Sequence, residues 1–336
     1  MTSVAILGAG AWGTALAVHL AQRASVNPRV ALYARNVDQA NTMAASRENA
    51  RYLPGVTLPV SLAVTSALAT AAQSEFLIAA TPVAALPDLA RQLKAMGARA
   101  PLIWVSKGFV SDPALPAGVG LPHQLLSPLW PASVGIVSGP TFAEEIARGL
   151  PAAVAVAATT PALATGMATL LRGDTLRAYE TDDLAGVEVG GAVKNVLAIA
   201  AGASDGLAFG HNARAALITR GLAETGRLLT ALGGRRETLM GLAGLGDLVL
   251  TCTGDLSRNR RVGLGLAQGK SLPAILDQLG HVAEGVTAAV AVRALAAHHE
   301  VEMPICDAVY RVLHEGLPAQ LAVAALLQRE PRSERV

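Results

Sequence analysis

Lysine and aromatic residues are scarce in this chain of 336 residues. Only four of its 27 cationic residues are lysines, and the rest are arginines; the lysines are Lys94, Lys107, Lys194 and Lys270. With 25 acidic residues the formal net charge is +2, which provides no overall field to attract a polyanion. Aromatics make up 3% of the chain, too few for the stacking surfaces that bind single-stranded nucleic acid. We therefore expect no nucleic-acid partner, and each lysine becomes a candidate for a specific role.

Cysteine is also scarce, and uninterrupted hydrophobic runs are short. Cys252 and Cys306 form no CxxC pair and the histidines show no metal-ligand spacing, so the sequence predicts neither a disulfide framework nor a metal site. A reducing cytoplasm is the simplest location for such a chain. Two uncharged stretches, 52–74 and 149–171, have the length of a membrane span, but prolines and turn residues interrupt both. We expect no membrane span.

The first half of the chain alternates short apolar runs with longer segments rich in alanine and leucine, a pattern typical of a doubly wound α/β domain. The expected strands are 4–7, 30–33, 60–64, 76–80, 102–105, 134–138, 152–157 and 175–179. After about residue 182 the pattern is helical, with long segments at 187–203, 212–232 and 282–298. The sequence thus predicts a dinucleotide-binding domain over 1–181 and an all-α domain over 182–330.

The first expected strand runs directly into a GxGxxG motif made by Gly8, Gly10 and Gly13, and a helical segment follows. The first glycine permits a tight turn, the second lets a pyrophosphate approach the backbone, and the third allows the helix to pack closely on the strand. Strand, glycine loop and helix in this order predict a Rossmann-type NAD(P) site. Trp12, the one large residue in the loop, packs either against the sheet or along the cofactor.

The acidic residue that usually binds the adenosine ribose is missing after the second expected strand, where the chain reads Ala34, Arg35, Asn36. A carboxylate there would repel a 2′-phosphate, whereas Arg35 can pair with one or stack on adenine. We expect NADPH to be accepted, beside NADH. The alternative is that Arg35 is an ordinary surface arginine.

Two later strand ends carry polar groups. Lys107 follows the strand at 102–105, and Gly139 to Thr141 follow the strand at 134–138. Ligands of open α/β sheets bind outside the carboxyl ends of the strands, so both segments are expected where a substrate would meet the cofactor. The alternative for Lys107 is a solvated turn lysine.

Lys194 lies one helical turn after Gly190 and Gly191. Because the glycines have no side chains, a neighbouring group can approach this face of the helix closely. Apolar surroundings would lower the pKa of this lysine toward the range useful for proton transfer. Asp247, at an expected loop-to-helix junction, would either cap the helix, the reading we favour for this residue alone, or orient the lysine. A lysine with an apolar stem and a solvated head is the alternative for Lys194.

Three arginines fall within the segment from Ser257 to Arg261, which reads SRNRR. Arginine binds phosphate oxygens through a forked set of donors, and the serine and Asn259 can add further hydrogen bonds. We expect this segment to bind a small phosphate. The alternative is that the segment is only a solvated basic surface.

Seven segments, taken in order, resemble the bacterial branch of the NAD(P)-dependent glycerol-3-phosphate dehydrogenase family and cover essentially the whole chain. They are GAGAWGTALA (8–17), SKG (106–108), SGPTFAEEIA (138–147), GGAVKNVLAI (190–199), GHNARAALITRGL (210–222), GLGDLVLTCT (244–253) and SRNRR (257–261). The resemblance implies an oxidoreductase that interconverts dihydroxyacetone phosphate and sn-glycerol 3-phosphate with NADH or NADPH. It also implies a cytoplasmic homodimer that supplies phospholipid biosynthesis.

The resemblance further implies roles for individual residues. Lys194 corresponds to the family's catalytic lysine, with Lys107 and Asp247 beside it in the active site. The implied cofactor contacts are Gly8, Gly10, Ala11, Trp12, Gly13, Arg35, Lys107, Ala143, Arg258, Val282 and Glu284. The implied substrate contacts are Lys107, Gly139, Thr141, Lys194, Asp247, Ser257, Arg258 and Asn259. Ala11 stands where many members have serine, which removes one hydroxyl near the pyrophosphate.

Two other functions fit parts of the pattern. A related two-domain reductase of a small keto acid, such as ketopantoate, would share the glycine loop and a catalytic lysine but would not need the 257–261 segment. A non-catalytic sensor with a helical dimerisation domain would bind NADPH without turning over any phosphorylated ketone.

Overall fold

The computed structural model describes residues 2–23, 25–280 and 283–328, and the chain forms two compact units. The first unit takes in Met1–Val110 and Pro122–Leu184, and the second takes in Ser111–Leu121 and Ala185–Val336. The chain therefore passes from the first unit to the second between Leu184 and Ala185, and one short excursion from the first half also belongs to the second unit.

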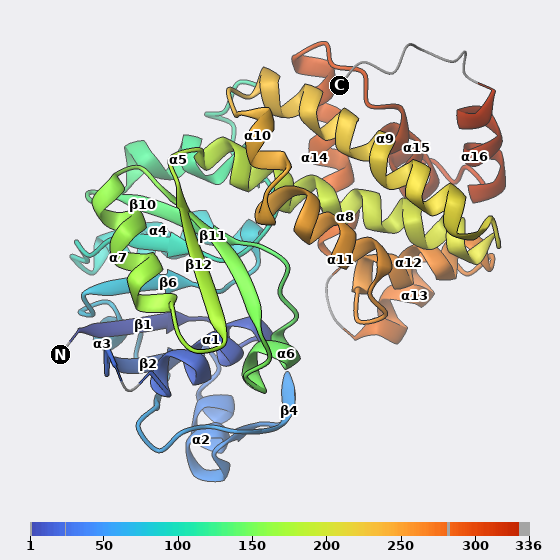
Figure 1. Ribbon diagram of the computed structural model, residues 1–336. Helices are drawn as coiled ribbons and strands as arrows, with labels where there is room; N and C mark the ends of the chain where they lie inside the picture. Colours follow the sequence, from blue (N-terminus) through green and yellow to red (C-terminus); the bar gives the residue numbers. More distant parts are fainter. Residues whose placement is uncertain (1, 24, 281–282, 329–336) are drawn as a thin grey trace. The chain divides into compact units, whose positions relative to one another are not determined.

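An eight-stranded sheet with the order β12-β11-β10-β7-β6-β1-β2-β5 forms the centre of the first unit (Figure 1). Its strands are β1 (Ser3–Leu7), β2 (Arg29–Tyr33), β5 (Ala63–Thr65), β6 (Phe76–Ala79), β7 (Leu102–Trp104), β10 (Val134–Ser138), β11 (Ala152–Ala158) and β12 (Leu176–Thr181). All neighbours are parallel except β10 and β11. The short α6 (Ala143–Ala147) connects these two, whereas parallel neighbours need a longer crossover. The expected α/β class is confirmed, with one antiparallel pair.

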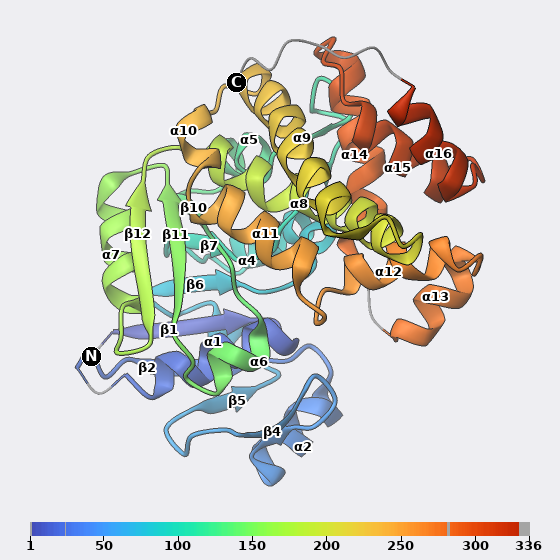
Figure 2. The same ribbon diagram turned by 45° about the vertical axis from the view of Figure 1, so that its right-hand side comes forward.

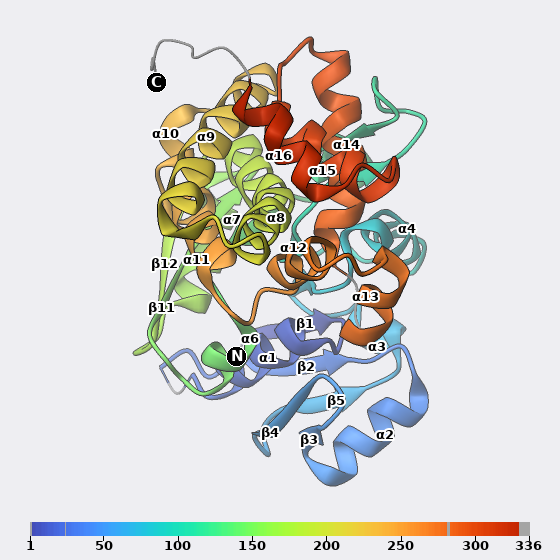
Figure 3. The ribbon, with the colours of Figure 1, turned by 90° about the vertical axis from the view of Figure 1, so that its right-hand side faces the viewer.

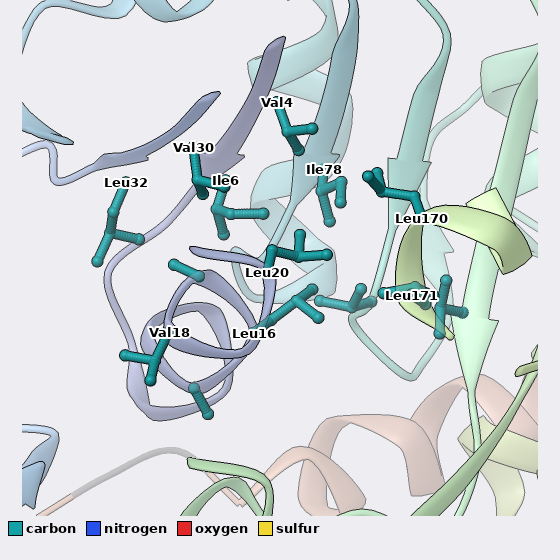
Figure 4. Close-up of a cluster of buried hydrophobic side chains, with 14 of the residues drawn as sticks. Val4, Ile6, Leu16, Val18, Leu20, Val30, Leu32, Ile78, Leu170 and Leu171 are labelled. Carbon is teal, nitrogen blue, oxygen red and sulfur yellow. The ribbon is translucent and has the colours of Figure 1, made fainter. Parts of the chain in front are cut away.

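Helices cover both faces of this sheet. Helices α1 (Ala11–Ala21) and α7 (Pro161–Leu171) lie on one face, and α4 (Leu86–Ala95) lies on the other (Figure 3). Helix α5 (Pro122–Leu129) contacts α4. Side chains of α1 and α7 meet over β1 and β6 in a buried cluster that includes Leu16, Leu20 and Leu171 (Figure 4). Alternate residues of a strand point to opposite faces, so the central strands are apolar throughout because both faces are covered.

The strand expected at 60–64 is wrong in its first half. Leu62 N donates to Pro59 O over 2.9 Å, which closes a turn, and Val60 is 96% exposed; pairing in the sheet starts only at Ala63. The proline-initiated turn overrides the strand preference of valine. The remaining elements of this half are α2 (Val37–Ser46), α3 (Leu68–Ala71), η1 (Val83–Ala85) and the pairs β3 (Glu48–Asn49) with β4 (Leu53–Thr57) and β8 (Val110–Ser111) with β9 (Val119–Gly120).

From residue 184 onward the described chain is helical, as predicted (Figure 2). Its elements are α8 (Leu184–Gly206), α9 (Gly210–Ala231), α10 (Arg236–Leu239), η2 (Leu242–Gly246), α11 (Asp247–Thr253), α12 (Arg258–Ala267), α13 (Leu272–Leu279), α14 (Glu284–His298), α15 (Pro304–His314) and α16 (Ala319–Leu327). Strand β9 contacts α14, which explains why 111–121 belongs to this unit.

Helix α8 has the length and apolar composition of a membrane span, but 94% of its most apolar window is buried inside the protein. Burial of this kind is what a core helix of a globular unit shows.

Candidate active site

The glycine loop joins β1 to α1 with the geometry of a phosphate-binding turn. Gly8 has φ +129°, and a Cβ there would lie 2.6 Å from Ala80 O. Gly13 packs directly on the carbonyl of Gly8, so a side chain there would collide with backbone. At Gly10 nothing lies within 4 Å of an added Cβ. Gly10 is also the N-cap of α1 and has no side chain, so it makes no side-chain cap bond to the first N–H groups of the helix. The loop fits a pyrophosphate.

Two amide side chains hold this loop from outside the motif. Asn49, which is 1% exposed, donates through Nδ2 to Ala9 O over 3.0 Å and to Thr14 Oγ1 over 2.8 Å. Gln39 Nε2 donates to the same carbonyl over 3.2 Å. The carbonyl of Ala9 is therefore fixed by two donors, and the peptide that presents Gly10 is fixed with it. Neither amide was predicted from the sequence, because no local motif marks either residue.

The other predicted cofactor residues of the first unit occupy the same edge of its sheet. Trp12 is partly buried against the hydrophobic core, which is consistent with both of its expected arrangements, on the sheet or along the cofactor. Arg35 is exposed just beyond the end of β2. Ala11 and Ala143 are the first residues of α1 and α6, two helices that contact each other. These positions are compatible with the cofactor roles that the resemblance implies.

Lys107 and Gly139 lie together, at the carboxyl ends of the paired strands β7 and β10. Lys107 Nζ donates to Gly139 O over 2.9 Å, and Thr141 Oγ1 donates to the same carbonyl over 3.2 Å. Gly139 has φ +155°, and a Cβ there would lie 2.9 Å from Ala153 O. Lys107 is therefore a half-buried, hydrogen-bonded lysine, which is not what a solvated turn lysine would show.

In the second unit, Lys194 is buried with a carboxylate and a hydroxyl around its ammonium. Its Nζ donates to Asp247 Oδ1 and, over 2.9 Å, to Thr251 Oγ1. The side chains of Lys194 and Asp247 are 8% and 2% exposed. Thr251 Oγ1 donates its own proton to Asp247 O over 2.6 Å, so toward the lysine it acts as an acceptor. The alternative of an apolar stem with a solvated head is therefore wrong for Lys194. Asp247 pairs with this lysine, whereas the sequence alone favoured a helix cap.

Close backbone packing explains how these residues meet. A Cβ on Gly190 would lie 2.6 Å from Ala243 O, so η2 lies directly against α8 at this point. Lys194 and Asp247 each follow their contact residue by four positions, one turn along their helices. Because Gly190 and Gly191 have no side chains, the segment that carries Asp247 can pack directly against α8 at this point. A buried carboxylate favours the charged ammonium, which opposes the desolvation expected from apolar surroundings alone.

The segment from Ser257 to Arg261 begins α12, and its polar groups have separate roles. Ser257 is the N-cap, with Oγ accepting from Arg260 N over 3.2 Å. Asn259 is buried: Nδ2 donates to Asn195 Oδ1 and Oδ1 accepts from Gly285 N, both over 2.9 Å. Arg258 is exposed. Of the other two arginines, Arg260 donates to the carboxylate of Asp255 and Arg261 to its backbone carbonyl, so both are engaged within the protein.

Other groups near the lysine are inert or outside the described residues. Burial raises the pKa of the Cys252 thiol to about 12, so this cysteine stays protonated despite the nearby Lys194. Of the two predicted cofactor residues at the start of α14, Glu284 is its first residue, whereas Val282 lies outside the described residues. The described residues include no group of three or more histidine, cysteine or acidic side chains that could hold a metal ion.

A pocket of about 430 Å³ lies elsewhere in the second unit, between α14 and the start of α15, where Val292, Val301 and Met303 line it. None of the predicted site residues lines this pocket, and we assign the chemistry to the buried lysine on the basis of its donors and acceptors.

Both halves of the chain match sequence models of one family. Residues 3–164 match the NAD-dependent glycerol-3-phosphate dehydrogenase N-terminus, and residues 183–324 match the C-terminus of the same family. The chain belongs to the NAD-dependent glycerol-3-phosphate dehydrogenase family. The expected family is confirmed.

Relatives within the family are similar over their full length. The glycerol-3-phosphate dehydrogenase (NAD(P)+) of Aromatoleum aromaticum is 54% identical over 336 residues, covering 98% of this chain and 99% of the relative. That of Thiobacillus denitrificans is 54% identical over 332 residues, covering 98% of each. The crystal structure of the glycerol-3-phosphate dehydrogenase from Coxiella burnetii superposes with a TM-score of 0.91 at 41% identity, over 98% of this chain and 99% of that one.

Sequence reasoning missed two residues of the lysine site. Thr251 follows Asp247 by four positions, so on any helix that begins near Asp247 the two share a face; this spacing was the available signal. Asn195 is next to Lys194 and binds Asn259, 64 positions away, which no local pattern indicates.

Proposed function

We propose that this chain interconverts dihydroxyacetone phosphate and sn-glycerol 3-phosphate, with NADH or NADPH as the cofactor. The observation that carries the proposal is the buried ammonium of Lys194, which Asp247 and Thr251 hold in place inside a member of this dehydrogenase family. A compact ammonium with three donors suits proton transfer, whereas an arginine cannot give up its proton at neutral pH.

The cofactor is held by the first unit. The open backbone at Gly10 and the N-terminus of α1 would bind the pyrophosphate, and the exposed guanidinium of Arg35 would meet the adenosine end, where it can accept a 2′-phosphate. Bound NADH or NADPH would supply the hydride in the reducing direction, and NAD+ or NADP+ would accept it in the oxidising direction. Lys107 and Thr141, through their bonds to Gly139 O, fix the strand-end turn that we assign to cofactor and substrate.

Lys194 handles the proton. In the reducing direction its ammonium donates to the oxygen at C2 of the ketone, where negative charge develops, and in the oxidising direction the neutral amine accepts that proton. General acid–base catalysis of this kind contributes about 10²–10⁴-fold in rate. Asp247 stabilises the charged form, and Thr251, whose proton is committed to a backbone carbonyl, presents only a lone pair to Nζ. The two partners therefore fix where Nζ sits.

Arg258 binds the substrate phosphate in this proposal. Its side chain is exposed, whereas Arg260 is paired with Asp205 and Asp255 and Arg261 Nε donates to the backbone carbonyl of Asp255. The fork of donors of Arg258 suits phosphate oxygens. The Ser257 hydroxyl keeps its donor proton, and the Asn259 amide keeps one N–H beyond its bond to Asn195. Anchoring the phosphate orients C2 and so lowers the entropic part of the barrier.

We extend the proposal to a cytoplasmic homodimer that works mainly in the reducing direction and supplies the backbone of phospholipids. The support is the family resemblance of the seven ordered segments. Light scattering after size-exclusion chromatography tests the assembly: a mass of about twice 34.2 kDa is expected, and a monomer at working concentration would contradict it.

The substrate is tested by mixing the protein with NADPH and adding dihydroxyacetone phosphate or ketopantoate in separate reactions, followed by the absorbance of the reduced cofactor. Oxidation with the phosphorylated ketone alone is expected. Oxidation with ketopantoate alone would favour the keto-acid reductase, and cofactor binding without turnover of either compound would favour the sensor.

A further inference from the structure

Arg260 belongs to the segment expected to bind phosphate, yet its side chain is turned into the second unit. The guanidinium is 13% exposed. Its Nε and Nη2 lie 2.9 and 2.8 Å from Asp205 Oδ2, and Nη1 donates to Asp255 Oδ1 over 2.9 Å. Residues two apart on a helix point in nearly opposite directions, so Arg258 faces away from this cluster. The two neighbouring arginines therefore have different tasks.

Asp205 is the centre of the cluster. Its carboxylate, 12% exposed, accepts from Arg260 of α12 and from Arg214 of α9, whose Nη1 lies 3.1 and 3.0 Å from the two oxygens. Arg214 also contacts His211 Nδ1 over 2.8 Å. Because Asp205 itself lies near the end of α8, one carboxylate ties together three helices. Largely buried, charge-assisted pairs with more than one hydrogen bond each fix geometry better than exposed pairs do.

The same helices touch backbone to backbone at two glycines. An added Cβ on Gly202 would lie 2.8 Å from the carbonyl carbon of Arg260, and one on Gly263 would lie 2.6 Å from Ala203 N. Helix α12 thus crosses α8 at a fixed distance three residues before Asp205. The Asn259–Asn195 bond adds a second polar link between the same helices, next to Lys194.

We propose that Asp205 and Arg260 are positioning residues, which set the direction in which Arg258 presents its guanidinium to the substrate phosphate. This inference rests on the proposed function, because it takes Arg258 as the phosphate ligand. The start of α12 is held on one side by the Arg260–Asp205 pair, so Arg258 can only point to the other side. Loss of the pair frees the first turn of α12 to rotate or fray, and the phosphate then binds to a less ordered partner.

The experiment measures the KM for dihydroxyacetone phosphate, kcat, and the inhibition constant of inorganic phosphate for Asp205→Asn and Arg260→Lys. We expect the KM and the inhibition constant to rise together by about tenfold in Asp205→Asn, since small misplacements of a binding group have effects of this order or larger. The KM for NADPH stays unchanged, and kcat at saturating substrate stays within about twofold of the parent. Arg260→Lys retains the charge but not the fork, so a smaller rise is expected.

Glu315→Gln is the matched control, because it removes an exposed carboxylate from Arg293, 2.5 Å away in the same unit, and leaves the 257–261 segment untouched. Unchanged KM and phosphate inhibition in Asp205→Asn, with only a lower melting temperature, would overturn the inference. If Asp205→Asn does not fold, Arg260→Lys decides by the same criterion. Arg258→Ala separates the two proposals: a higher KM there keeps the phosphate site, whereas no change would remove that site and the inference with it.

Discussion

The buried pair of Lys194 and Asp247 makes a quantitative prediction about stability. Replacing Lys194 with methionine or Asp247 with asparagine keeps the side-chain volume but leaves the partner without its countercharge. Both side chains are less than a tenth exposed. Removing one member of a buried ion pair costs about 3–5 kcal/mol, because the remaining charge has lost its compensation. Each single variant should lose stability by this amount.

The double variant should lose less than the sum of the two. With both charges gone, the site holds two neutral side chains of similar size, and the desolvation penalty of a lone charge no longer applies. We expect a coupling free energy of about 2–3 kcal/mol between the two positions. The parent, the two single variants and the double variant all keep Thr251. This residue therefore affects the comparison only through its hydrogen bond to Lys194 Nζ.

The positions of the tryptophans allow urea denaturation of the two units to be followed by different signals. Trp12, Trp104 and Trp130 are the three tryptophans, and all lie in the first unit. Tryptophan fluorescence therefore follows the first unit during urea denaturation, whereas helical circular dichroism has a large contribution from the second. Only the dichroism midpoint should shift in the variants. Strictly additive losses, with no coupling, would refute the account of this pair.

Three further predictions concern other contacts. Burial raises the pKa of Glu224 from 4.5 to about 7 although its carboxylate accepts from Ile305 N and Cys306 N; the folded state thus favours the protonated form, and stability should fall by about 3 kcal/mol as pH rises from about 4.5 through 7. Circular dichroism of Glu224→Gln should show a flatter pH profile, and a profile parallel to the parent would contradict this. Asn49→Ala should weaken NADPH binding by about tenfold in fluorescence titrations, at unchanged KM for the ketone, because the Ala9 carbonyl loses a buried donor; equal affinities would mean that the loop needs no such support. Arg35→Ala should raise the KM for NADPH about tenfold more than that for NADH, since only NADPH carries the 2′-phosphate; equal changes would place that phosphate elsewhere.

Features that depend on neighbouring residues in the sequence were predictable. Gly8, Gly10 and Gly13 follow a strand and precede a helix, so their role follows from local geometry. Lys107 and Gly139 could be brought together because parallel strands end at the same edge of a sheet. The close approach expected at Gly190 is also present, and the partner is the backbone of Ala243. In each of these cases a short segment contains its own structural reason.

Features that depend on distant partners were not predictable. Arg258 and Arg260 are equivalent in the sequence, and only Asp205, 55 positions before Arg260, decides which of them turns inward. Asp247 has the position of a helix cap, and the burial of Lys194 beside it determines its actual role. Asn49 shows no motif, since its target is the glycine loop 40 positions earlier. The direction of a side chain depends on tertiary contacts that periodicity does not contain.

The most direct test of the central claim is the turnover of Lys194→Ala with dihydroxyacetone phosphate and NADPH, measured beside NADPH binding in the same protein. Lys270→Ala is the control, because Lys270 is exposed and belongs to no proposed site. We predict that Lys194→Ala binds NADPH with nearly unchanged affinity and loses turnover by at least about 100-fold, while the control keeps both. Normal turnover in Lys194→Ala would contradict the account.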